Sequence, residues 1–84
     1  MWHERGHCQD ANQLEGKYAN YFKVGHNALE FVIDFGQFYS DNGEVQLHTR
    51  IVTNPTYAKA MLATLRESID KHEREFDAIS TSNE

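Results

Sequence analysis

Three side chains suited to acid–base chemistry, His26, Glu30 and Asp34, lie close together in the central part of the chain. A pair of carboxylates can act as general acid and general base when a cleft shifts their pKa values apart. The surrounding segment instead alternates between apolar and polar residues, which is typical of β-strands. We therefore interpret these residues as strand and turn positions, and we expect no catalytic residues and no enzymatic activity.

A second polar group combines Asp34 and Arg50, with His48 nearby. Arg50 could donate hydrogen bonds to an anion or to the carboxylate of a partner, which would make this group a ligand-binding site. The alternative is a cross-strand ion pair between Asp34 and Arg50 that contributes little to stability. The residue types allow both interpretations.

The N-terminal residues His3, His7 and Cys8 could bind a metal ion. On a helix, His3 and His7 would share a face and could ligate zinc. The local sequence supplies three candidate ligands and no matching pair elsewhere, so we expect no cofactor. Cys8 is the single cysteine, which excludes a disulfide within the chain and favours a reducing compartment.

Two segments with period-two alternation, residues 18–24 and 29–35, predict two antiparallel strands. The segment Gly25–Ala28 between them is rich in residues that tolerate turn geometry, so we expect a hairpin. The predicted register pairs Val24 with Leu29, Phe22 with Phe31, Tyr21 with Val32 and Lys23 with Glu30.

Residues 44–53 predict a third strand. A three-residue loop, Asp41–Gly43, with Gly43 in the left-handed region, would pair Ile33 with Ile51 and Asp34 with Arg50. One face of this strand would then carry Val45, Leu47, Thr49 and Ile51. Gly36 is interpreted as a β-bulge or a point of close backbone approach.

A long helix is predicted from Asn54, a good N-cap, and Pro55, at the first helical position, to about Asp77. Its apolar residues are spaced alternately by four and three, which forms a heptad seam. The seam contains Ala58, Leu62, Leu65, Ile69, His72, Phe76 and Ile79. We expect the helix to cross one face of the sheet, with its last two turns overhanging.

The predicted architecture is α+β: a three-stranded antiparallel β-meander followed by one long C-terminal α-helix. Residues 1–16 form an irregular N-terminal arm, residues 17–79 a single domain and residues 80–84 a polar tail. The net charge of −5 disfavours nucleic-acid binding. No signal peptide or apolar run long enough to span a bilayer is present in the sequence, so we expect a cytoplasmic protein with no membrane partner.

With strands and helix assigned, the chain resembles the bacterial domain-of-unknown-function family 3467. The resemblance rests on "YANYFKVGHNALEFVIDFGQ" and "HTRIVTNPTYAKAMLATLRESIDKHEREF", and it covers residues 17–77. Matching positions are Asn20, Glu30, Phe31, Asp34, Phe35, Arg50, Pro55, Ala58, Lys59, Leu62 and Leu65. The resemblance implies the fold and a bacterial origin, and it carries no enzymatic activity.

One helix over three strands leaves apolar surface uncovered, so we expect a non-enzymatic protein–protein interaction module. It would be a homo-oligomer, in the first instance a dimer, or an accessory subunit of a larger bacterial complex. The expected interface residues are Tyr21, Val32, Val52, Ile69, His72, Phe76 and Ile79. In such an interface His72 could make assembly sensitive to pH. The alternative function is a small ligand- or metal-binding module that uses the open sheet face or the N-terminal His/Cys arm.

Overall fold

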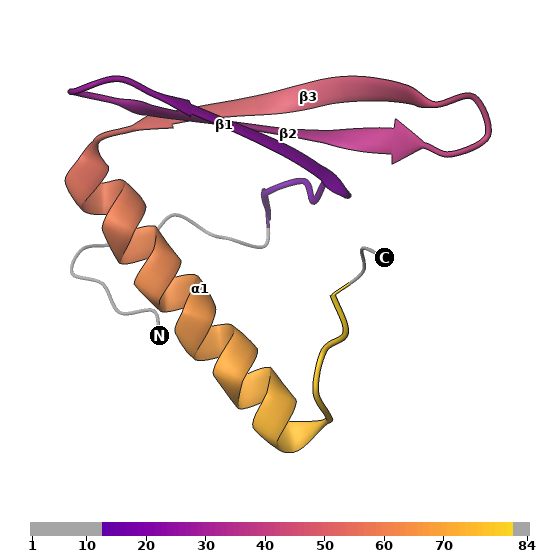
Figure 1. The fold of residues 1–84 in the computed structure, drawn as a ribbon, viewed down its shortest axis with the longest axis vertical. Helices are drawn as coiled ribbons and strands as arrows, with labels where there is room; N and C mark the ends of the chain where they lie inside the picture. Colours follow the sequence, from indigo (N-terminus) through magenta and orange to yellow (C-terminus); the bar gives the residue numbers. More distant parts are fainter. Residues whose placement is uncertain (1–12, 82–84) are drawn as a thin grey trace.

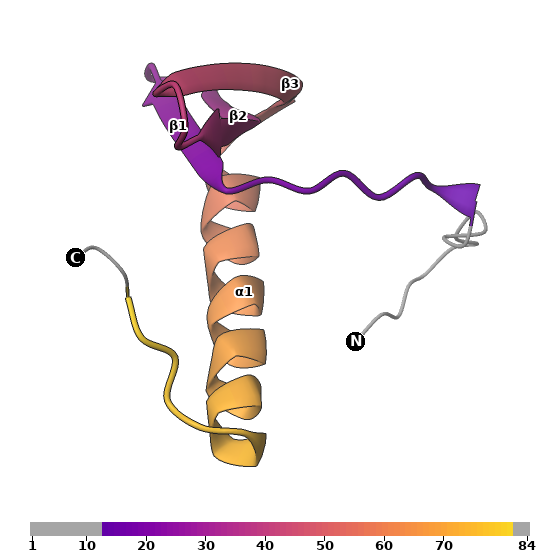
Figure 2. The same ribbon diagram turned by 90° about the vertical axis from the view of Figure 1, so that its right-hand side faces the viewer.

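A computed structural model of the protein describes residues 13–81, and it contains three strands followed by one long helix (Figure 1). The strands form one antiparallel sheet in the order β1-β2-β3. The elements are β1 (Tyr21–His26), β2 (Phe31–Tyr39), β3 (Glu44–Thr53) and α1 (Pro55–Glu75). The predicted α+β fold and β-meander are therefore confirmed. Residues 15–20 lead into β1 as an extended segment (Figure 2).

The turn between β1 and β2 has the predicted four residues but lies two residues further along the chain, at residues 27–30. Asn27 organises it: its side-chain oxygen accepts hydrogen bonds from the backbone N–H groups of Leu29 (2.8 Å) and Glu30 (2.9 Å). This side chain stabilises a four-residue loop, because Asn readily forms such local turns. The predicted β1–β2 register is wrong. The observed pairs include Tyr21 with Gly36, Phe22 with Phe35, Lys23 with Asp34 and Val24 with Ile33.

The register between β2 and β3 agrees with the prediction in its central part. Ile33 pairs with Ile51 and Asp34 pairs with Arg50. Gly43 has the expected positive φ of 71°, although four residues rather than three separate the strands.

A β-bulge interrupts this ladder between Phe35 and Gly36, where the partners step from Thr49 to Leu47 and leave His48 as the extra residue. Beyond the bulge Leu47 pairs with Gly36, and Val45 pairs with Phe38. The predicted common face of Val45, Leu47, Thr49 and Ile51 is therefore wrong for the first two.

Gly36 allows the strands to approach closely at the bulge, as the sequence suggested. A Cβ atom on Gly36 would lie 2.9 Å from Leu47 Cα and closer still to the backbone oxygen of Gln46. Both neighbours are backbone atoms, which cannot move aside cheaply. Only glycine therefore fits this position without distortion.

The helix α1 begins as predicted. The Asn54 side-chain oxygen accepts a hydrogen bond from Tyr57 N (2.8 Å), and Pro55 occupies the first turn. The helix ends at Glu75 rather than Asp77, with Phe76 as C-cap. Ile79 therefore lies outside the helix, on a segment that turns back, where its N–H donates to Glu73 Oε2 (2.8 Å).

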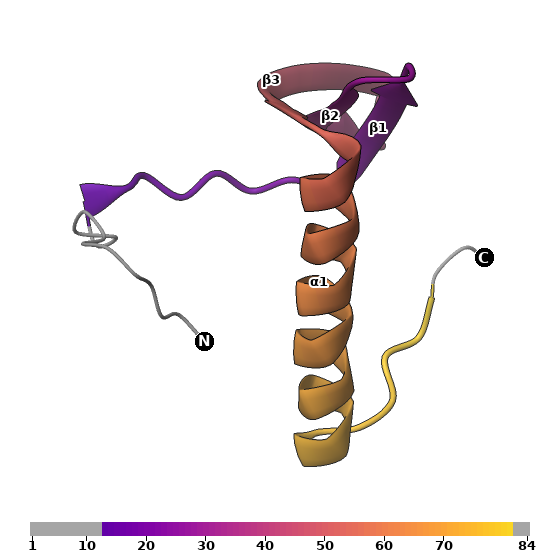
Figure 3. The same cartoon turned by 90° about the vertical axis from the view of Figure 1, so that its left-hand side faces the viewer.

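The helix does not cover the sheet. In Figures 2 and 3 only its first turn lies near the strands, and the rest projects away from them. No residue of α1 is buried. The expectation of a helix crossing one sheet face is thus wrong, and within residues 13–81 Ile33 is the sole buried apolar residue, at 7% exposure. No helix in this range is long and apolar enough to span a membrane.

Candidate functional site

Asp34 on β2 and Arg50 on β3 form an ion pair across the two strands. Arg50 Nε lies 2.7 Å from Asp34 Oδ1, and Arg50 Nη2 lies 2.8 Å from Oδ2. This two-point geometry is the strongest arrangement available to an arginine and a carboxylate. Asp34 is only 4% exposed, whereas 67% of the Arg50 side chain is exposed.

The ion pair shifts the acid–base behaviour of both groups. The hydrogen bond from Arg50 is the main reason that the pKa of Asp34 lies below its ordinary value of 3.8. Burial acts in the opposite direction, and the positive charges of Arg50 and then Lys23 add to the lowering. The same hydrogen bond raises the pKa of Arg50. Asp34 is therefore a stably ionised acceptor, which is the opposite of what a general acid at neutral pH requires.

His48 contributes to a different contact from the one predicted. A shallow hollow of about 290 Å³ is lined by Asp34, Leu47, His48, Thr49 and Arg50. The His48 ring, however, is bound elsewhere: Nε2 lies 3.0 Å from the backbone oxygen of Tyr18, and Nδ1 lies 2.7 Å from the Thr49 hydroxyl. Since a carbonyl oxygen only accepts, Nε2 is the donor. His48 thus anchors the segment before β1 to the bulge.

The acid–base candidates of the central segment are not brought together. His26 stacks on Phe31, with ring centroids 5.4 Å apart, and these two residues are paired across β1 and β2. Glu30 lies in the loop between the strands. Asp34 points to the other face of the sheet from His26, because strand side chains alternate. The three residues therefore do not form a site.

The predicted metal ligands His3, His7 and Cys8 lie outside the described residues. Within residues 13–81, no group of three or more His, Cys, Asp or Glu side chains is arranged to hold a metal ion.

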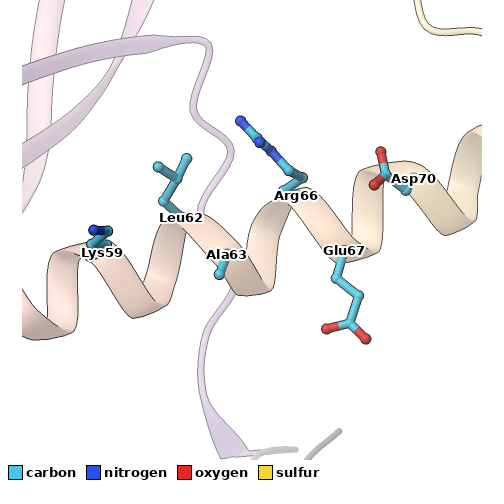
Figure 4. Close-up of a pocket in the computed structure, with 6 residues that line it drawn as sticks. All are labelled: Lys59, Leu62, Ala63, Arg66, Glu67 and Asp70. Atoms are coloured by element: carbon cyan, nitrogen blue, oxygen red, sulfur yellow. The ribbon is translucent and has the colours of Figure 1, made fainter.

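The main exposed apolar surface of the helix is the seam on α1. Its side chains have no cover from the sheet: Leu62 and Leu65 are each 55% exposed, and Phe76 is 68% exposed. Beside the seam, a hollow of about 360 Å³ follows the flank that contains Ala63 (Figure 4). In that view Leu62 and Arg66 point to the same side of the helix, whereas Glu67 points away.

A further hollow of about 370 Å³ lies where α1 leaves the sheet. Its lining residues are Phe31, Pro55, Ala58, Lys59 and Leu62. Four of the five are apolar, and Ala58 forms a low point between larger neighbours. We refer to this feature as the junction hollow.

A comparison with protein-family models identifies the family of this chain. A family model described as "Protein of unknown function (DUF3467)" matches residues 7–81, most of the chain. The chain belongs to the DUF3467 family. The match confirms the resemblance seen in the sequence and extends it, since it also includes residues 7–16. No curated protein and no solved structure matched this DUF3467 chain.

Asn20 of the DUF3467 chain has a structural role that the pattern of residue types around it does not indicate. Asn20 precedes β1, and its side-chain oxygen accepts a hydrogen bond from Phe38 N (2.7 Å), while its backbone N–H donates to Gly36 O (3.0 Å). The side chain thus continues the pairing of β1 with β2 by one step. Asn20 is among the positions that carry the family resemblance, and that was the available signal.

The predicted interface residues of the DUF3467 chain fall into two groups. On the sheet, Tyr21 and Val32 are half-buried, and Val52 is exposed. On and after the helix, every predicted interface side chain is exposed: Ile69, His72, Phe76 and Ile79. The junction hollow was not predicted, because it depends on the angle at which α1 leaves the sheet.

Proposed function

We propose that this DUF3467 chain is a protein–protein interaction module without enzymatic activity that self-associates, with a homodimer as its basic form. The observation that carries the proposal is the bare helix: α1 has an apolar seam and no buried residue. A seam of this kind is the usual packing surface between helices.

The free energy of folding supports self-association. Ordering a residue costs roughly 1–2 kcal/mol of backbone entropy, and burial of apolar surface is the main term that offsets this cost. Within residues 13–81 Ile33 is the one buried apolar side chain, and it cannot offset the ordering of this part of the chain. The missing burial must come from a second surface, and a copy of the same chain is the simplest source.

We further propose a bacterial, cytoplasmic protein that can serve as an accessory subunit of a larger complex. The sheet residues Tyr21, Val32 and Val52 and the residues of the seam would be its contact surfaces. The alternative, a ligand site at the hollow beside Arg50, is less well supported. Nε and Nη2 of Arg50 already bind Asp34, so this pair is better explained as a structural contact.

Light scattering coupled to size-exclusion chromatography tests the proposal. The chain has a mass of 9.7 kDa. We expect a species of about twice this mass at micromolar concentrations, because an isolated chain leaves its seam in water. A monomeric mass at every accessible concentration would contradict self-association.

A further inference from the structure

We propose that two copies pair through antiparallel α1 helices, and that Phe76 of each copy enters the junction hollow of the other. This inference rests on the proposed self-association and specifies its geometry. One alignment of the two helices must therefore match the seam residues, bring opposite charges together and place Phe76 at the hollow.

The seam residues match best when the second helix runs in the opposite direction. In one antiparallel alignment Leu65 faces Ile69 and Leu62 faces His72 of the other copy. The same alignment places Ala58 opposite Phe76, so the smallest seam residue meets the largest. A parallel alignment would instead place Phe76 beside Phe76 and Ala58 beside Ala58. Interior packing favours the pairing of small with large side chains.

The charges on the flank of the seam favour the same direction. Lys59, Arg66 and Glu73 follow each other at seven-residue intervals, so they form one row along the helix. In the antiparallel alignment Lys59 of each copy lies near Glu73 of the other, which gives two opposite-charge contacts per dimer. Arg66 lies near the two-fold axis, and Asp70 at i+4 supplies a compensating charge. A parallel pair brings Lys59 near no acidic residue of the other helix.

The junction hollow fits the residue that this alignment delivers. Phe76 is 68% exposed and lies at the end of α1, where it contacts His72 with ring centroids 4.8 Å apart. The second copy presents Ala58 at that level, and Ala58 lies in the hollow of about 370 Å³. The apolar walls of the hollow can receive an aromatic ring, and Lys59 at its rim is placed to meet Glu73. Two-fold symmetry fills both hollows at once.

The first experiment compares two aromatic side chains of nearly equal exposure. We expect Phe76→Ala to raise the dissociation constant of the dimer at least tenfold, because it empties both hollows. Ala58→Trp should have a similar effect, since it fills the hollow from within its own chain. Tyr57→Ala is the matched control: Tyr57 is 65% exposed but lies off the seam, so its removal should leave the dissociation constant unchanged. Analytical ultracentrifugation measures all four proteins.

The second experiment tests the direction of the helices by exchanging charges. Lys59→Glu and Glu73→Lys should each weaken the homodimer, by on the order of tenfold, because each creates two like-charge contacts. An equimolar mixture of the two variants should form heterodimers in preference, since the mixed pair restores both opposite-charge contacts. Native mass spectrometry with one variant isotope-labelled measures the ratio. Lys71→Glu, on the far side of the helix, is the control. It should change neither the strength of the homodimer nor the proportion of heterodimer in a mixture.

The outcomes separate this inference from the proposed function. A dimer that is unaffected by Phe76→Ala, or whose charge variants show no preference for each other, would overturn the antiparallel geometry and leave self-association standing. A wild-type monomer would overturn both. Loss of the dimer in Glu73→Lys without recovery in the mixture would indicate damage to the contact with Ile79 N, and would also count against the geometry.

Discussion

At the scale of single residues, the acidic, basic and histidine side chains of the sheet make structural contacts within the chain. Asp34 is ionised and bound at two points by Arg50, and His48 holds the backbone of Tyr18. Most hydrogen-bonding atoms of these side chains are already occupied by contacts within the chain, which leaves few to bind a substrate. These polar residues therefore mainly fix the register of β2 with β3 and the position of the segment before β1.

The first residue-scale prediction concerns Arg50→Gln. In the wild type the pKa of Asp34 is held below 3.8, mainly by the hydrogen bond from Arg50. A lowered folded-state pKa stabilises the protein above the ordinary pKa, and this contribution is lost as the pH falls through the lowered value. We expect the pKa of Asp34 to rise in the variant, because the remaining burial favours the neutral carboxyl. Carbon-13 NMR titration of the carboxyl group measures it directly.

Lys23→Gln provides the matched control for this titration. Lys23 pairs with Asp34 across β1 and β2, but its charge is the smallest of the causes that lower the pKa. The pKa of Asp34 should therefore move less than in Arg50→Gln. Equal shifts in the two variants would contradict the dominant role of the hydrogen bond.

The sequence predicted the Asp34–Arg50 pair because the alternating faces of β2 and β3 had to agree. The observed loop is one residue longer than predicted, and the bulge compensates for that residue, so the predicted pairs hold on the far side of the bulge. It did not predict the role of His48. That role depends on the bulge, which removes His48 from the ladder, and on the path of residues before β1. Neither feature has a periodic signal in the sequence.

At the scale of elements, Gly36 is the position where one added methyl group should matter most. Gly36→Ala brings a Cβ to 2.9 Å from Leu47 Cα, so the strands must separate or the bulge must shift. We expect a loss of about 1–3 kcal/mol in the free energy of unfolding, as for other overpacked sites. Denaturant unfolding at fixed protein concentration measures this loss.

Gly25→Ala is the control for Gly36→Ala, because no heavy atom lies within 4 Å of a Cβ built there. This variant should unfold at the same denaturant concentration as the wild type or slightly above it. The reason is that alanine leaves the unfolded chain with less conformational entropy than glycine does. Similar destabilisation by both substitutions would show that the close approach at the bulge is not the cause.

The strands themselves were predictable, but the register of the first pair was not. Alternation fixes which side chains share a face, and moving the turn by two residues preserves that assignment. Phe22 consequently faces Phe35 rather than Phe31 while the apolar face stays apolar. The side-chain hydrogen bonds of Asn27 decide the loop, and a sequence with several turn-forming neighbours does not identify which one will act.

At the scale of the whole molecule, the proposed dimer would make stability a property of the assembly, because helix and sheet do not cover each other. Proteins that fold only as dimers melt at a temperature that rises with concentration. We expect the melting temperature of the wild type to rise by several degrees over a hundredfold increase in concentration. Circular dichroism melts measure this dependence. The proposal would fail if the melting temperature were independent of concentration.

The fold class followed from the sequence because each element has its own periodic signal and its own caps. The placement of α1 did not, because a seam shows only that a helix packs against something. The prediction assumed that the partner would be the sheet of the same chain. The structure leaves that seam open, and the proposed contact between chains is what would cover it.

The bulge at His48 has a consequence for how sequences of this type can change length. The extra residue reverses the alternation beyond it, so Val45 and Leu47 share the side of Asp34 instead of the side of Ile51. Deleting His48 would make Leu47 the direct neighbour of Thr49, with Gly36 and Phe35 still as their partners, so strict alternation would return and no side chain would change sides. The bulge thus gives β3 a tolerance of one residue in length, because a chain without the extra residue keeps the same strand partners on both sides of that point.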